Sequence, residues 1–340
     1  LKQRLSLARA QGCLGLRELT EAGRYAEWAA AGPDRVVASE AMLLRARSAE
    51  MSLDLVSARQ TYTVASHESV VSWDRRLAEY GASRVDELST CEVASEPGVS
   101  VLPDDRTTRG DWPIGYGREQ YLLCAHNYYL DRTGGAGPEL DCSFRTTDVD
   151  EPSRLWVTAK SDDDAAALWD PIVRAGRPAN RDDYGEQYEI GGGPDLIVDL
   201  DVPGGTHVLS LNFVNDYNYY EPKRAYTISL TDPGVALLAV TDVAHFGGGV
   251  YKRFAVAGPR HLQFRLWRNL SLNTLLSGIF LDAMPQAESE PPISLAGGPD
   301  SSWALSEALH IRGRHRAAEA AFDRYLDDVA RVAAADELAA

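Results

Sequence analysis

The residues best suited to chemistry in this sequence form a run of aromatic and polar side chains. Asp216, Tyr217, Asn218, Tyr219 and Tyr220 follow one another directly, after a segment of alternating apolar residues. Tyrosine rings offer flat faces to the C–H side of a sugar, while Asp and Asn side chains hydrogen-bond hydroxyl groups. We therefore predict a ligand site in this loop, with carbohydrate as its ligand class. The same tyrosines could instead pack on the sandwich edge, against the helical domain or between copies of the protein.

Two clusters of aspartates could supply oxygen ligands to a cation. Asp162, Asp163 and Asp164 form the first cluster, and Asp182 with Asp183 forms the second. Carboxylate oxygens suit calcium, but neither cluster has the DxDxDG spacing of a calcium loop. We expect these to be solvated acidic turns, with a structural calcium as the alternative, and we expect no other cofactor.

The chain contains four cysteines, without the CxxC spacing of a zinc site. Cys124 and Cys142 fall in neighbouring predicted strands and form the best candidate pair for a disulfide. Two buried free thiols are the alternative interpretation.

Catalytic motifs are missing from the sequence. The GxSxG nucleophile elbow and the HExxH metal motif do not occur, and the glycines at Gly247–Gly249 lack the spacing and the Ser/Thr of a phosphate loop. We therefore expect a protein that is not an enzyme. A pair of carboxylates for glycoside cleavage has no sequence motif, so a hydrolase stays open as an alternative.

Composition limits the partners. The 340 residues carry 50 acidic against 34 basic side chains and a formal net charge of -16, which disfavours nucleic acid and anionic membrane surfaces. No apolar run reaches the roughly 18 residues of a membrane span, so we expect no membrane insertion. The chain begins at Leu1 rather than at a methionine, which would fit an exported protein whose leader was removed.

The centre of the chain predicts antiparallel strands. Leu196, Val198 and Leu200 alternate with polar residues, and the pattern resumes at His207 after Pro203-Gly204-Gly205. We interpret that Pro-Gly-Gly run as a tight turn between two strands. Short apolar segments separated by glycine-rich turns continue over residues 100–285, which predicts a β-sandwich domain of jelly-roll type.

Both ends of the chain read as helical. Residues 1–92 are rich in Ala, Leu, Arg and Glu with apolar positions three and four apart, and only Gly32-Pro33 interrupts them strongly. Residues 300–340 predict a helical hairpin, in which Trp303–Leu326 resembles one tetratricopeptide (TPR) repeat. One repeat cannot bury its own faces, so we expect it to pack on the N-terminal helices or on a neighbouring copy. The predicted fold is thus α+β and multidomain.

The central domain contains the stretches DLDVPGGTHVLSLNFVND from Asp199, RAYTISLTD from Arg224 and LLSGIFLDAM from Leu275. These three stretches resemble galactose-binding-like and malectin-like jelly rolls. Members of such superfamilies bind sugars, bind proteins or act as spacers, so the resemblance implies a fold rather than a ligand.

We expect an extracellular or cell-envelope adhesion or assembly protein, with a carbohydrate-binding-like sandwich. Its partners would be other copies or envelope proteins that dock on the helical segments, and glycans. A self-assembling subunit of a filament or surface layer is the first alternative. A sandwich-fold glycoside hydrolase is the second.

Overall fold

The computed structural model describes residues 1–284 except 128–129, 149, 151, 158–164, 216–223 and 245. The chain forms two compact units, whose described parts are 1–85 and 86–284. The first unit is helical and the second is mostly antiparallel β-structure, so the α+β class is confirmed. The predicted hairpin at 300–340 lies outside the described residues.

Five helices lie in the N-terminal part of the chain. They are α1 (Lys2–Gly15), α2 (Leu19–Ala30), α3 (Arg35–Met51), α4 (Leu55–Glu68) and α5 (Ser72–Leu88). The break predicted at Gly32-Pro33 is confirmed, because α2 ends just before it and α3 begins just after it. Asp34 caps α3 by accepting hydrogen bonds from the backbone N–H groups of Val36 and Val37, so the interruption also starts the next helix.

An ion pair lies inside the helical unit. The Arg84 guanidinium donates to both Glu50 carboxylate oxygens at 2.6 and 2.7 Å, and the Tyr62 hydroxyl donates to Glu50 at 2.8 Å. All three side chains are buried. Such a pair is costly to break, because removing one partner leaves a charge without compensation inside the core.

The described part of the second unit contains fourteen strands and two short 3-10 helices. The strands are β1 (Val99–Asp105), β2 (Gln120–Leu123), β3 (Arg132–Gly134), β4 (Cys142–Thr146), β5 (Arg154–Val157), β6 (Leu168–Asp170), β7 (Ala175–Arg177), β8 (Ala179–Asp182), β9 (Leu196–Phe213), β10 (Tyr226–Asp232), β11 (Ala236–Val243), β12 (Val250–Trp267), β13 (Leu275–Leu276) and β14 (Gly278–Ala283). The 3-10 helices are η1 (Trp112–Ile114) and η2 (Gly185–Gln187).

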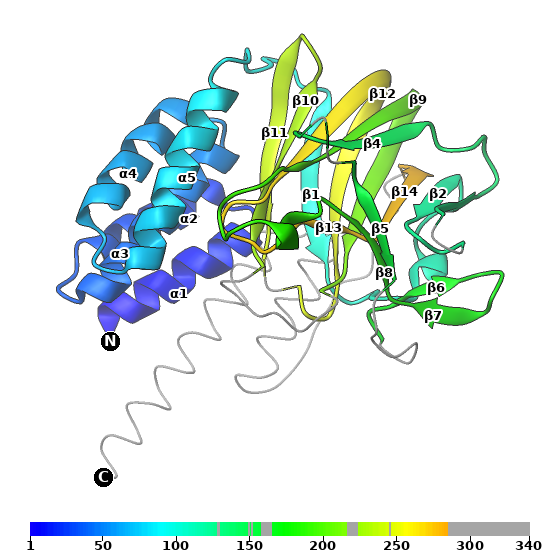
Figure 1. Ribbon diagram of the computed structural model, residues 1–340. Coiled ribbons are helices and arrows are strands. Elements are labelled where there is room, and N and C mark those ends of the chain that lie inside the picture. Colours follow the sequence, from blue (N-terminus) through cyan, green and yellow to red (C-terminus); the bar gives the residue numbers. More distant parts are fainter. Residues whose placement is uncertain are drawn as a thin grey trace, which may run out of the picture. The chain divides into compact units, whose positions relative to one another are not determined.

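Two long strands organise this unit, and Figure 1 shows them side by side. β9 and β12 pair along their whole length. The strand order of the sheet is β11-β10-β12-β9-β14-β2-β3, and in addition β1 pairs with β12 and β4 pairs with β9. The neighbours change part-way along. β4 and β10 flank the pair at 196–200 of β9, whereas β1 and β14 flank it at 207–213. The β9–β12 pair therefore belongs to two halves of the sheet.

The change occurs at a bend. We predicted a tight turn at Pro203-Gly204-Gly205, and this prediction is wrong: the chain continues as one strand of 18 residues. On the paired strand β12, the register shifts between Gly258 and Arg260, which lie opposite this part of β9. A Cβ atom on Gly258 would lie 1.9 Å from the Pro203 carbonyl oxygen, so the backbones meet too closely for a side chain. Pro and Gly here bend a continuous ladder instead of reversing the chain.

The core lies between the two halves. Phe254 and Phe264 both belong to β12, yet their ring centroids are 5.3 Å apart. Ten residues of straight strand would span about 33 Å, so this contact requires the strand to fold back over itself. Val198 of the first half and Leu209 of the second lie in the same buried cluster. Sandwich-like packing follows from these contacts.

Candidate functional site

The first half of the sheet carries a polar outer face. The core side chains point inward, and the opposite side presents a set that we call the polar face: Ser143, Arg145, Asp195, Ile197, Asp199, Asp201, Ser229, Thr231, His261, Gln263, Arg265 and Trp267. One row of it runs in register across four strands, from Arg145 of β4 through Ile197 and Arg265 to Ser229 of β10. Alternation along each strand therefore places these side chains together.

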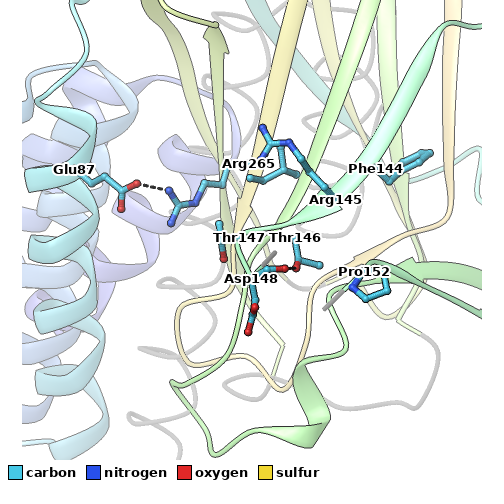
Figure 2. A pocket seen from close by; sticks show the side chains of 9 residues that line it. Glu87, Phe144, Arg145, Thr146, Thr147, Asp148, Pro152 and Arg265 are labelled. Carbon is cyan, nitrogen blue, oxygen red and sulfur yellow. Dashed lines mark hydrogen bonds and ion pairs between the residues drawn. The ribbon is translucent and has the colours of Figure 1, made fainter. Parts of the chain in front are cut away.

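A hollow of about 630 Å³ opens beside β4, and we call it the β4 pocket (Figure 2). Its lining combines apolar, hydroxyl and charged side chains: Glu87, Phe144, Arg145, Thr146, Thr147, Asp148, Pro152, Ile197 and Arg265. All of them belong to the second unit. Ligand sites in proteins commonly have volumes of about 300–1,000 Å³, so this hollow has a suitable size.

Both arginines of the β4 pocket are paired with carboxylates. Arg265 donates through Nε to Asp195 at 2.8 Å and forms a second ion pair with Glu87, which Figure 2 shows as a dashed line. Arg145 donates through Nε to Asp199 at 3.2 Å, and its side chain is 51% exposed. The pocket therefore offers directed hydrogen bonds without an excess of positive charge.

The segment that follows β4 is fixed at its base. Thr147 donates its backbone N–H to the Asp195 carbonyl at 3.0 Å, and its hydroxyl accepts from the Asp195 N–H at 2.9 Å. The Thr146 hydroxyl donates to the Asp148 carbonyl at 2.8 Å. These bonds hold the Asp148 end of the pocket against β9, so the rim is preorganised.

The predicted ligand loop, Asp216, Tyr217, Asn218, Tyr219 and Tyr220, lies outside the described residues. Its two flanks are described. Arg224 donates to Asn215 at 2.8 Å and to the Asn273 side-chain oxygen at 2.8 Å, and Asn273 donates to Asp182 at 3.2 Å. The flanks of the predicted loop are therefore tied to one of the predicted acidic clusters.

That acidic cluster is buried. Burial raises the pKa of Asp183 to about 7 and also raises the pKa of Asp182. Asp183 accepts from the backbone N–H groups of Gly185 and Thr274 and from the Thr274 hydroxyl, at 2.8 to 3.0 Å. Asp182 accepts from Arg154, which also forms an ion pair with Glu186. Side-chain and backbone donors surround both carboxylates.

The calcium candidates have different outcomes. Asp162, Asp163 and Asp164 lie outside the described residues. Asp182 and Asp183 are engaged by donors, and no group of three His, Cys, Asp or Glu residues in the described part of the chain is placed to hold a metal ion. Calcium binding stays a prediction.

Arg154 sits between two aromatic rings. Its guanidinium carbon lies 4.6 Å from the Trp156 ring centroid and 4.5 Å from that of Tyr184. Tyr184 has a φ of 62°, a left-handed backbone conformation that costs a non-glycine residue free energy. The Asp182–Glu186 turn thus holds Arg154 rigidly by charge and by stacking.

Cys124 and Cys142 are free thiols in the structure. Burial raises the pKa of the Cys142 thiol to about 12 and raises that of Cys124 as well. The charge of Cys142 adds to the shift at Cys124, so the two lie near one another. The disulfide between them stays a prediction.

Sequence reasoning missed the β4 pocket. Arg145 and Arg265 are far apart in the sequence, and only the pairing of β4 and β12 with β9 brings them to one row. One signal was present, since Asp195, Asp199 and Asp201 mark the outward side of a strand that needs positive partners. The sequence does not say which arginines these are.

Within the described residues, no helix is both long and apolar enough to cross a membrane. No family model and no curated protein matches the chain. Solved structures give distant likenesses at 11% identity, and this chain spans between 17% and 33% of their lengths.

Three of these structures are enzymes by name. A β-glucuronidase of Bacteroides uniformis matches 48% of this chain with a TM-score of 0.27, and an exo-β-1,3-galactanase of Phanerochaete chrysosporium matches 44% with 0.24. A family GH115 4-O-methyl-α-glucuronidase with specificity for decorated arabinogalactans matches 79% with 0.23. At these TM-scores the likeness carries no argument about the activity of this chain.

The expectation that the chain is not an enzyme is corrected here: the matched structures are enzymes by name, and the missing motifs give that expectation no support. That expectation rested on missing motifs. Carboxylates that cleave glycosides are defined by their separation in space and leave no motif in the sequence, so the missing motifs could not support it.

Proposed function

We propose that the β-sandwich unit binds carbohydrate in the β4 pocket. The observation that carries the proposal is the lining of this hollow of about 630 Å³, in which Phe144, Pro152 and Ile197 lie beside hydroxyl and charged groups. Apolar side chains suit the C–H side of a sugar ring, while Thr, Arg and Asp side chains suit its hydroxyls.

Charge favours a neutral ligand over an anion. Arg145 is paired with Asp199, and Arg265 is paired with both Asp195 and Glu87. An anion would have to compete with these carboxylates for the same guanidinium groups. A hydroxyl group can accept from a guanidinium and donate to a carboxylate at once, so it adds to the ion pair without breaking it.

The test is binding by a panel of neutral oligosaccharides, screened on an array and then measured by isothermal titration calorimetry. Arg145→Ala removes a half-exposed donor of the pocket, and we expect it to weaken binding by about tenfold, the size of one charge-assisted hydrogen bond. Arg118→Ala removes an exposed arginine that does not line the pocket and serves as the matched control. Equal affinities of the two variants would contradict the proposed site.

Glycoside hydrolysis is the second candidate function. The observation that favours it is the acidic cluster, where burial raises the pKa of Asp183 to about 7 and Glu186 lies a few residues further on with a partly exposed side chain. A carboxyl that keeps its proton near neutral pH can act as a general acid, and a second carboxylate can act as base or nucleophile. Asp183 is buried, so this role requires that substrate binding expose it.

Turnover separates this candidate from binding alone. Reducing-sugar release from the bound oligosaccharides should fall by about a hundredfold or more in Asp183→Asn, because an amide cannot donate the proton. Because Asp183 is fully buried, the melting temperature of the same variant must be measured beside its activity. Wild-type protein that binds the panel and releases no sugar ends this candidate and leaves the binding proposal standing.

Further predictions from the sequence concern the detailed topology, the cellular location and the partners of the protein. Galactose-binding-like jelly-roll topology, TPR-like helices, export to the cell envelope, docking of envelope proteins on the helices and assembly of copies all remain predictions. Fractionation of cells that produce the protein, and sedimentation of the purified chain, test location and assembly directly.

A further inference from the structure

A second hollow, of about 360 Å³, lies on the polar face beside the β4 pocket. Its lining comprises Glu87, Leu88, Thr90, Cys91, Glu92, Ser229, Thr231, Asp232, Pro233, Gly234, Val235, Ala236, Gln263, Arg265 and Trp267. We call it the β10 hollow. Two residues, Glu87 and Arg265, line both hollows, so the hollows meet at one ion pair.

The strand register shows how the two hollows are joined. One row of the polar face runs Arg145, Ile197, Arg265, Ser229, and the next runs Ser143, Asp199, Gln263, Thr231. Each row crosses β4, β9, β12 and β10. Three strand spacings of about 4.8 Å give a length of roughly 14 Å, which is more than one sugar ring.

Two hydrogen bonds at Asp199 connect the first row with the second. Asp199 accepts from Arg145 at 3.2 Å on one side and from the Gln263 amide at 2.8 Å on the other. Gln263 therefore links the β4 pocket with the β10 hollow. A ligand that crosses the strands meets donors and acceptors at each step.

The contact that divides the two hollows is weak. The Glu87 side chain is 56% exposed and that of Arg265 is 21% exposed. Ion pairs between exposed side chains contribute little free energy, because water and salt screen them. Arg265 also donates to Asp195 and lies 3.4 Å from the Trp267 ring centroid, and neither contact involves Glu87.

We propose that the β4 pocket and the β10 hollow form one groove that binds an extended, neutral oligosaccharide across the strands. This inference rests on the proposed carbohydrate binding and specifies its ligand class as a chain of several sugar units. Terminal units occupy the β4 pocket and the β10 hollow, and the unit between them displaces Glu87 from Arg265.

Chain length provides the test. Mono-, di-, tetra- and hexasaccharides of the xylose, cellulose and galactan series are titrated calorimetrically into the full chain. We expect the hexasaccharide of the bound series to bind about tenfold more tightly than its disaccharide, the gain from one further charge-assisted contact.

Two variants locate the gain. Thr231→Trp fills the β10 hollow and Gln263→Ala removes the link between the rows, so each should abolish the length dependence. Thr231→Trp should also leave disaccharide affinity unchanged, because Thr231 does not line the β4 pocket. Thr133→Trp on the edge strand β3, a partly exposed threonine that lines neither hollow, is the matched control for added bulk. If the tryptophan side chain of Thr231→Trp prevents folding, Gln263→Ala still provides the test.

The outcomes separate the inference from its premise. If no sugar of any length binds, or if Arg145→Ala leaves binding unchanged, the proposed function itself fails. If sugars bind in the β4 pocket but affinity is independent of length, or if both β10-hollow variants retain the length dependence, only the groove is overturned.

Discussion

The same two strands, β9 and β12, contribute to a polar surface on one side of their bend and to an aromatic surface on the other. In the first half the outward side chains form the polar face, in which arginines and aspartates pair across strands. In the second half the outward side chains include large aromatic ones that are covered. Trp112, Tyr116, Leu123, Leu168, Tyr251 and Phe280 form a closed cluster there.

The covering of this second, aromatic face is specific. The Tyr116 and Tyr251 rings stack with centroids 4.3 Å apart, and Trp112 packs on Phe280 at 5.2 Å. The Trp112 indole donates to the Trp169 carbonyl at 2.7 Å. Because one face is covered and the other is open, we expect the two faces to have different roles. Substitutions on the aromatic face should affect stability, and substitutions on the polar face should affect binding.

The bend should give the largest effect, because both faces depend on it. Gly258→Ala places a Cβ atom against the Pro203 carbonyl, and we expect a loss of about 4 kcal/mol or more in the free energy of unfolding. Gly204→Ala on the facing strand is the control, since its nearest contact would be an ordinary 3.8 Å to Pro259. The control should stay within about 1 kcal/mol in urea unfolding. Similar losses in both variants would contradict the close approach.

Truncation on the aromatic face should come next. Phe280→Ala removes a fully buried ring that contacts Trp112, Tyr116 and Tyr251, and we expect a loss of about 3–5 kcal/mol. Arg145→Ala on the polar face should change stability by less than about 1 kcal/mol. Urea titrations of the two variants measure the contrast, and a large loss in Arg145→Ala would mean that the polar face also acts as core.

Ion pairs sharpen the same comparison. Lys252 lies in β12 of the second half, is buried, and contacts both Asp104 carboxylate oxygens at 2.8 Å. Asp104→Ala leaves that ammonium without a partner and should cost about 3 kcal/mol. Glu87→Ala removes an exposed partner of Arg265 and should cost about 1 kcal/mol or less. High salt should reduce the second effect more than the first, because it screens the exposed pair.

The smallest net effect is expected in the pH profile, where two buried groups oppose each other. Burial raises the pKa of Asp183 from 3.8 to about 7, so the folded carboxyl keeps its proton where the unfolded one has lost it. Stability from this group falls as pH rises from about 4 to 7. Burial lowers the pKa of His126 from 6.5 to about 4, so the unfolded ring takes up a proton first on acidification. Stability from His126 therefore rises over pH 4 to 6.5.

Single substitutions should reveal each slope. Asp183→Asn should leave a stability that rises with pH between 4 and 6.5, and His126→Gln should leave one that falls. The groups that face His126 are Asp170, 3.5 Å away, Arg132 and Arg177, and all three are retained in both variants. Urea unfolding at half-unit steps of pH measures the slopes. Parallel profiles of the two variants would contradict the opposing shifts.

Several parts of the fold were accessible from sequence because they depend on neighbouring residues. The helix break at Gly32-Pro33 and the alternation around Leu196 are local signals, and both appear in the structure. The prediction of a turn at Pro203-Gly204-Gly205 was wrong because contacts with a distant part of the chain determine the local conformation. A Pro-Gly-Gly run can reverse a chain or bend it. Here the chain bends, because β9 stays paired with β12 and the backbone at Gly258 approaches Pro203 closely.

Helices at the start of the chain, antiparallel strands in its middle and an outward row of aspartates at 195–201 could all be predicted from the sequence. Three further features depend on the folded chain: which side chains meet those aspartates, the folding of β9 and β12 over their own core, and the shared pocket of Arg145 and Arg265. The reason is that alternation along one strand fixes the face on which a side chain lies. Its neighbours on that face come from other strands, and the sequence does not encode their register locally.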